Sequence, residues 1–171
     1  SNGQVNGNVY GGGEVGRVEW NTQVTIGAGE GTPIINGSVF GAGAGVATHG
    51  YAALVRGNST VTVQGNAKVL QNVYGGGEQA TVGIYWVKGV NDNVTGAPTA
   101  PTDTPDEMPY QTMSGGKCTV TIQGSAKIGP ESGAASETTG HVFGAGKGVT
   151  PNYIHTGNKA NWSRRMVDYT T

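Results

Sequence analysis

The sequence predicts an all-β fold, a parallel β-solenoid (β-helix) of about four stacked rungs, and three observations support it. A motif of valine, an aromatic residue and glycine returns four times in two alternating versions. It reads Val-Tyr-Gly-Gly-Gly-Glu at residues 9–14 and 73–78, and Val-Phe-Gly-Ala-Gly at residues 39–43 and 142–146. Short Thr/Val segments recur in register with this motif. Finally, a unit this small cannot bury its own apolar face, so the units must stack on one another.

The composition agrees with short strands and excludes several other classes. Of 171 residues 32 are glycine, which opposes long helices, and no Gly-X-Y period suggests collagen. A net charge of −1 without a basic run argues against nucleic-acid binding. No apolar run reaches the ~20 residues that direct insertion into a membrane requires. The single cysteine, Cys118, excludes an internal disulfide and a cysteine-based zinc site.

The first recurring segment is a predicted strand at residues 23–26, 60–63 and 119–122. Polar and apolar residues alternate there, as in a strand with one buried face. The side chains expected to point inward are Val24, Ile26, Val61, Val63, Val120 and Ile122. Cys118 has the parity of Val120, so we expect it to be buried and inert.

A tight corner and two shorter strands complete each repeat. Residues 64–69 and 123–128 match position by position, and Gly65 and Gly124 should adopt a positive φ. A short inward-facing strand follows at Val69 or Ile128, and the valine–aromatic pair comes next. Stacking in register predicts one ladder of valines and one of aromatic residues: Val9, Val39, Val73 and Val142, and Tyr10, Phe40, Tyr74 and Phe143. A β-sandwich is the alternative fold, but it does not explain why three motifs keep one register.

The third repeat carries an insertion at about residues 84–117. Residues 84–87 are apolar and could extend a strand, whereas residues 91–116 have the Pro, Thr, Asp and Gly composition of a loop. This loop holds weak candidates for calcium ligands: Asp92, Asp103, Asp106 and Glu107. Their irregular spacing fits a solvated acidic loop better, and three scattered histidines make zinc improbable, so we predict no metal.

Two glycine motifs suggest phosphate binding but lack the context it needs. Residues 11–16 fit Gly-x-Gly-x-x-Gly, yet a strand and not a helix is expected after them. Lys147 follows Gly-Ala-Gly, yet Gly148 stands where a phosphate loop needs Ser or Thr. We therefore predict no cofactor.

The alternating glycine motifs and the Thr-Val-Thr-Val segments resemble the repeat regions of large secreted or surface proteins of gut Bacteroidetes. The resemblance covers most of the chain apart from the insertion and the last twenty residues. It implies a β-helical or adhesin-type stalk segment located outside the cell or on its surface. It brings no catalytic residues with it.

We expect a non-enzymatic structural or adhesive segment. Its expected partners are the neighbouring repeats of the same longer chain, and a glycan or a host or microbial surface protein. The candidate glycan contacts are aromatic: Tyr10, Phe40, Tyr74, Phe143, Trp20 and Trp86. A plainer interpretation is that the repeated aromatics only hold rungs together. The alternative function is a polysaccharide lyase or hydrolase fragment on a β-helix, in which Glu14 and Glu78 would line one face two rungs apart. Solvated glutamates at a glycine corner are the plainer interpretation of that pair.

The whole chain, residues 1–171, is expected to be one repeat domain. Thr170 and Thr171 stand where the next Thr-Val-Thr-Val strand is due. We therefore expect a slice of a longer protein, whose uncapped ends associate with one another.

Overall fold

The computed structural model describes residues 2–46, 52–87, 110–114, 116–132 and 136–148, and within these ranges the fold is all-β with no helix. The side chains of residues 84–87 and 110–114 are outside this description. The strands are β1 (Gln4–Val5), β2 (Val9–Tyr10), β3 (Thr22–Ile26), β4 (Ile34–Ile35), β5 (Val39–Phe40), β6 (Ser59–Val63), β7 (Lys68–Val69), β8 (Val73–Tyr74), β9 (Ile84–Val87), β10 (Tyr110–Ser114), β11 (Cys118–Ile122), β12 (Lys127–Ile128) and β13 (Val142–Phe143).

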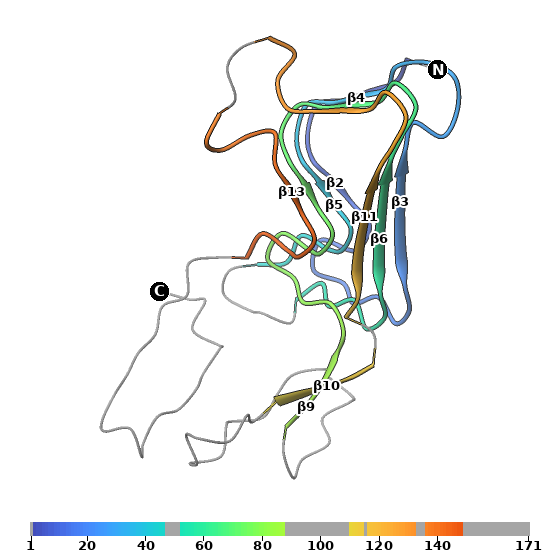
Figure 1. Ribbon diagram of the computed structural model, residues 1–171. Coiled ribbons are helices and arrows are strands. Elements are labelled where there is room, and N and C mark those ends of the chain that lie inside the picture. The colour runs from blue at the N-terminus through green and yellow to red at the C-terminus, as the bar shows by residue number, and fades with distance from the viewer. Residues whose placement is uncertain (1, 47–51, 88–109, 115, 133–135, 149–171) are drawn as a thin grey trace.

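Three parallel sheets stack along the molecule, as the predicted solenoid requires (Figure 1). One sheet contains the longer strands in the order β3-β6-β11, and the other two have the orders β1-β4-β7-β12 and β2-β5-β8-β13. We call one pass of the chain through these sheets a rung. The first rung is β1–β2, the second β3–β5, the third β6–β8 and the fourth β11–β13. The predicted fold class is confirmed.

The register between rungs places like residues on like. Val61 pairs with both Val24 and Val120, and Val39 pairs with both Val9 and Val73. The predicted valine and aromatic ladders are therefore confirmed across all four rungs, since Val142 and Phe143 also pair with Val73 and Tyr74. The motifs set this register because any slip would exchange the inward and outward faces of every strand.

Small aliphatic side chains fill the interior between the sheets. The core cluster consists of Val24, Ile35, Val39, Val61, Val63, Ala67, Val69 and Val73. Ile26 and Val120 pack against it as predicted, although each is only partly buried.

The predictions for two residues of β11 were wrong. Ile122 is 37% exposed and Cys118 is half-buried, whereas both were expected inside. Both belong to the edge strand of its sheet, and no further strand pairs with β11 in the described part of the chain. Burial in a stack depends on the next rung as well as on strand parity.

Glycine corners allow the rungs to approach closely. A Cβ atom on Gly41 would lie 2.2 Å from the carbonyl oxygen of Gly75 in the next rung. Gly65 and Gly124 have φ values of 61° and 70°, which confirms the predicted left-handed corners.

A bridging segment that the sequence did not predict packs beside the glycine corners. Val55 forms parallel bridges to Val18 and to Val82, and Ala53, Leu54 and Val55 are fully buried. This segment leads each turn of the chain back toward the next long strand.

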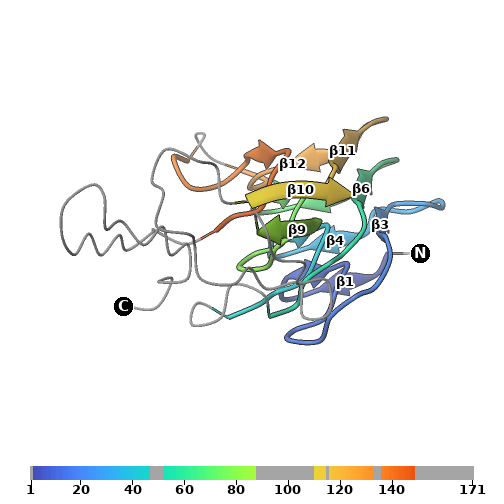
Figure 2. The ribbon, with the colours of Figure 1, turned by 90° about the horizontal axis from the view of Figure 1, so that it is seen from below.

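The insertion begins and ends with strands. β9 and β10 pair antiparallel, with Tyr110 opposite Val87, outside the three parallel sheets (Figures 1 and 2). The strand expected at residues 84–87 is confirmed, but the loop composition of residues 91–116 concealed β10. The weak calcium candidates lie at residues 92–107, outside the described residues.

Candidate functional site

The aromatic ladder on the β2-β5-β8-β13 sheet is the most regular side-chain feature of the molecule. Successive ring centroids from Tyr10 to Phe40, Tyr74 and Phe143 lie 5.0, 4.8 and 4.9 Å apart, with interplanar angles of 8°, 5° and 11°. Val39 and Val73 belong to the core cluster. Neighbouring residues of a strand point to opposite faces, so the rings lie on the face of the sheet away from that cluster.

Stacking covers the faces of the middle rings. Phe40 is 1% exposed and Tyr74 is 8% exposed, whereas Phe143 at the end of the ladder is 43% exposed. A sugar ring stacks on an open aromatic face, and the middle rings offer none because a neighbouring ring lies on each side.

The other aromatic candidates lie elsewhere. Trp20 precedes β3 and is 82% exposed. Trp86 lies on β9, and its side chain is outside the described residues. The structure thus joins four of the six candidate glycan contacts into one stack and leaves Trp20 as a separate exposed indole.

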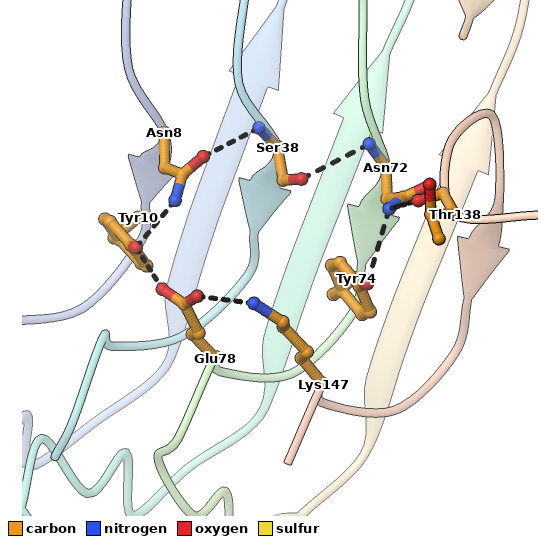
Figure 3. Close-up of polar contacts among 8 residues, drawn as sticks. All are labelled: Asn8, Tyr10, Ser38, Asn72, Tyr74, Glu78, Thr138 and Lys147. Atoms are coloured by element: carbon orange, nitrogen blue, oxygen red, sulfur yellow. Dashed lines mark hydrogen bonds and ion pairs between the residues drawn. The ribbon is translucent and has the colours of Figure 1, made fainter. Parts of the chain in front are cut away.

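A chain of polar contacts borders the ladder and runs from the first rung to the fourth (Figure 3). Asn8 Nδ2 donates to Tyr10 Oη at 3.0 Å, and this hydroxyl donates to the Glu78 carboxylate. The other Glu78 oxygen accepts from Lys147 Nζ at 2.8 Å. One carboxylate therefore links the first, third and fourth rungs.

The residue at the glycine corner of the second rung explains how Glu78 can reach Tyr10. Ala44 lies between Glu14 and Glu78 in the stack, since Gly45 N donates to Glu14 O and Gln79 N donates to Ala44 O. The short side chain of Ala44 leaves the space that a longer one would fill. Phe40, the ring of the same rung, has no hydroxyl to compete for the carboxylate.

These contacts change the acidity of both partners. Burial acts to raise the pKa of Glu78, but the hydrogen bonds from Lys147 and Tyr10 and the Lys147 charge outweigh it, and the net pKa is lowered. Burial and the bond to Glu78 raise the pKa of the Tyr10 phenol. At neutral pH the carboxylate is ionised and the phenol is protonated, so the bond between them is charge-assisted.

The two glutamates of the repeated motif have different surroundings. The Glu14 side chain is exposed and makes no hydrogen bond to the described residues. Glu78 is 21% exposed and bonds to both Tyr10 and Lys147. Their corners lie two rungs apart, on either side of Ala44, but only Glu78 is built into the stack.

Sequence reasoning missed a polar ladder that runs beside the valines. Asn8 Oδ1 accepts from Ser38 N at 2.8 Å, and Ser38 Oγ accepts from Asn72 N at 3.3 Å (Figure 3). Asn72 Oδ1 accepts in turn from His141 N at 2.9 Å. Each side chain thus bonds to the backbone of the next rung. The signal was present, because a polar residue precedes the valine in every copy of the motif.

A second polar ladder of this kind lies before the long strands. Asn21 Oδ1 accepts from Asn58 N at 2.8 Å, and Asn58 Oδ1 accepts from Lys117 N at 3.0 Å. These side chains satisfy backbone donors at corners where no sheet bond is available.

Hydroxyl groups inside the stack bond to the glycine corners. Thr22 Oγ1 donates to Gly41 O at 2.6 Å, and Ser59 Oγ donates to Gly75 O. Cys118 pairs with Ser59 in register, but its thiol contacts the Gly116 carbonyl at 3.9 Å. Cys118 therefore occupies a structural ladder position in the fourth rung.

An open hollow lies outside β7 and β12. Its lining includes Lys68, Lys127, Ile128 and Glu131, and the Lys68 ammonium pairs with the Glu131 carboxylate. Among the described residues no three His, Cys, Asp or Glu side chains gather as metal ligands would. The same part of the chain holds no helix that is long and apolar enough to cross a membrane.

Stacked parallel sheets joined by aromatic and asparagine ladders define the class of this protein, a β-solenoid. In comparisons with family models, curated proteins and solved structures, none matched the chain.

Proposed function

We propose that this chain is a non-enzymatic structural segment of an extracellular or cell-surface protein. The observation that carries the proposal is how the polar groups are used. Side chains that could serve in a reactive site bond instead to other rungs, as Glu78 does to Tyr10 and Lys147. Asn72 likewise bonds to His141 N and Thr138 O. Such contacts stabilise a stack of rungs.

A glycoside hydrolase, one form of the rival function, requires a pair of carboxylates of which one is a general acid with a raised pKa. The pKa of Glu78 is instead lowered, because its contacts with Lys147 and Tyr10 outweigh the effect of burial. A carboxylate that already accepts from a phenol and an ammonium is a poor proton donor at neutral pH. This supports the structural proposal over a hydrolase.

An adhesive role for the same segment would depend on Trp20. This indole is 82% exposed beside an ion-paired surface, in which Glu19 binds Arg17 at 2.6 Å and Arg56 at 3.0 Å. A flat exposed aromatic bordered by charged donors and acceptors is a common surface for stacking on sugar rings. The buried rings of the ladder would stabilise the stack of rungs and would not contact a glycan.

A panel of host and microbial glycans, assayed for binding and for cleavage, tests the proposal. We expect no cleavage. If a glycan binds, Trp20→Ala should abolish its binding, whereas Phe40→Leu, which changes a buried ring, should retain it. Turnover that disappears in Glu14→Gln or Glu78→Gln would establish the enzymatic alternative. Both glutamine variants keep the side-chain shape, and a circular dichroism spectrum equal to that of the wild type would show that a loss of activity does not reflect a lost fold.

A further inference from the structure

The two ends of the stack expose complementary edges. In the part of the chain that the structure describes, β12 and β13 are edge strands at one end of the stack, and β1 and β2 are edge strands at the other. An edge strand presents unpaired backbone donors and acceptors that can pair with another chain. Apolar side chains are exposed at both ends: Val142 is 46%, Phe143 43% and Val5 40% exposed.

The aromatic ladder is complementary between its ends. It reads Tyr, Phe, Tyr, Phe from the first rung to the fourth. Phe143 stacks on Tyr74, meets the tilted His141 ring at 5.8 Å, and is still 43% exposed. The half-buried Tyr10 at the other end stacks on Phe40 through one face only. Placing Tyr10 of another molecule on Phe143 would continue both the alternation and the repeated spacing of about 5 Å.

The charges at the glycine corner are complementary in the same way. This position is occupied by Glu14, Ala44, Glu78 and Lys147 in successive rungs. The last of these is a cation that is half exposed, and the first is an exposed anion. Lys147 already bonds to Glu78 one rung below at 2.8 Å, so a glutamate one rung above would meet the same ammonium from its other side.

We propose that a second copy of this chain docks head-to-tail on the fourth rung, with its β1–β2 edge against β12–β13. Tyr10 of the second molecule stacks on Phe143, and its Glu14 pairs with Lys147. Different surfaces meet in such a contact, so it extends into linear assemblies and does not stop at a dimer. The inference rests on the proposed structural function and specifies its partner, another copy of the same chain.

Sedimentation velocity of the full chain at low salt, from about 10 μM to 1 mM, tests the contact. The mean mass of the wild-type chain should rise with concentration. Glu14→Lys and Lys147→Glu should each weaken association, since each places like charges at the contact. An equimolar mixture of the two variants should restore it, because every contact in alternating chains then joins opposite charges. The double variant should associate by itself for the same reason.

A second pair of variants controls for net charge. Glu131→Lys and Lys68→Glu change the net charge by the same amounts and also break an ion pair, but they act on the outer face of the β7–β12 sheet. An equimolar mixture of these two control variants should associate no more strongly than either variant alone, because neither changes a charge at the proposed contact. For Glu14→Lys and Lys147→Glu we expect the association constant to fall by roughly threefold to tenfold. This is the effect of replacing the attraction of one exposed ion pair by a repulsion of similar size.

Phe143→Ala tests the aromatic half of the contact and should weaken association by a similar factor. A wild-type chain that stays monomeric at 1 mM would overturn the proposal, as would a mixture of the end variants that associates no better than either alone. This readout is independent of the glycan assay. Failure here with no glycan cleavage would remove the docking partner and leave the structural function intact.

Discussion

The carboxylate of Glu78 should contribute measurably to stability, whereas that of Glu14 at the matching position should not. Replacing Glu78 by alanine removes a charge-assisted hydrogen bond from Tyr10 and an ion pair with Lys147. The first contributes about 1.5 kcal/mol, at the lower end for bonds to charged groups because the site is only partly buried. The second contributes about 0.5 kcal/mol. We therefore expect a loss of about 2 kcal/mol.

Thermal unfolding followed by circular dichroism measures this loss. For a chain of this size, 1 kcal/mol corresponds to roughly 2–4 °C, so Glu78→Ala should lower the melting temperature by roughly 4–8 °C. Glu14→Ala is the matched control, because the same residue type at the same place in the repeat makes no hydrogen bond to the described residues. Its effect should stay within about 0.5 kcal/mol.

A double-mutant cycle separates the Tyr10 bond from the ion pair. Tyr10→Phe removes only the hydroxyl and keeps the stack on Phe40. The coupling between Tyr10→Phe and Glu78→Ala should be about 1 kcal/mol, as for residues in direct contact. Equal losses in the Glu14 and Glu78 variants, or no coupling to Tyr10, would refute the view that Glu78 links nonadjacent rungs.

Three further predictions concern the same stack. The folded-state pKa of Glu78 lies below its usual value of 4.5, so its contribution to the free energy of unfolding should be complete above pH 4.5. That contribution should decline as the pH falls through the lower folded pKa, and acid titration of Glu78→Gln should show no such decline. Gly41→Ala should destabilise by about 2–3 kcal/mol in urea unfolding, because its Cβ would meet the Gly75 carbonyl, whereas Gly16→Ala, with open space around it, should be near neutral. Asn72→Ala should cost about 2 kcal/mol by removing buried bonds to His141 N and Thr138 O, and Asn66→Ala at an exposed corner should have little effect.

The ladders could be predicted from sequence because stacking repeats one environment at each rung. Val39 and Val73 occupy equivalent positions, so the same residue type recurs and the register can be found by aligning the motifs. The face of each strand followed from parity, and Val61 and Val63 are buried as expected. Position within the stack has no such signal. Ile122 has the same parity as these valines and is exposed because its strand is at the edge.

The site was harder to predict because its contacts join residues that are not equivalent. Tyr10 and Glu78 are 68 residues apart and belong to different rungs, so aligning the repeats places them at different positions. The asparagine ladder had a signal in the polar residue before each valine, but the backbone group that each side chain bonds depends on its rotamer, which the sequence does not reveal. β10 was missed for another reason: a two-stranded antiparallel pair needs little apolar periodicity, and its partner β9 lies more than twenty residues earlier in the sequence.

The alternation of the two motif versions has a physical explanation in these contacts. A carboxylate can span two rungs only if the rung between them has a short side chain at the corner and no competing hydroxyl on its ring. The second rung supplies both through Ala44 and Phe40, and the Tyr-Gly-Gly-Gly-Glu rungs on either side supply the hydroxyl of Tyr10 and the carboxylate of Glu78. In the fourth rung Lys147 occupies the corner instead, and its ammonium binds Glu78. The unit that the sequence repeats is then a pair of rungs and not a single one. An additional pair of rungs could form the same bond only where the rung between has a short corner residue such as Ala44, whereas a rung with a lysine there, as at Lys147, offers its ammonium to the carboxylate instead.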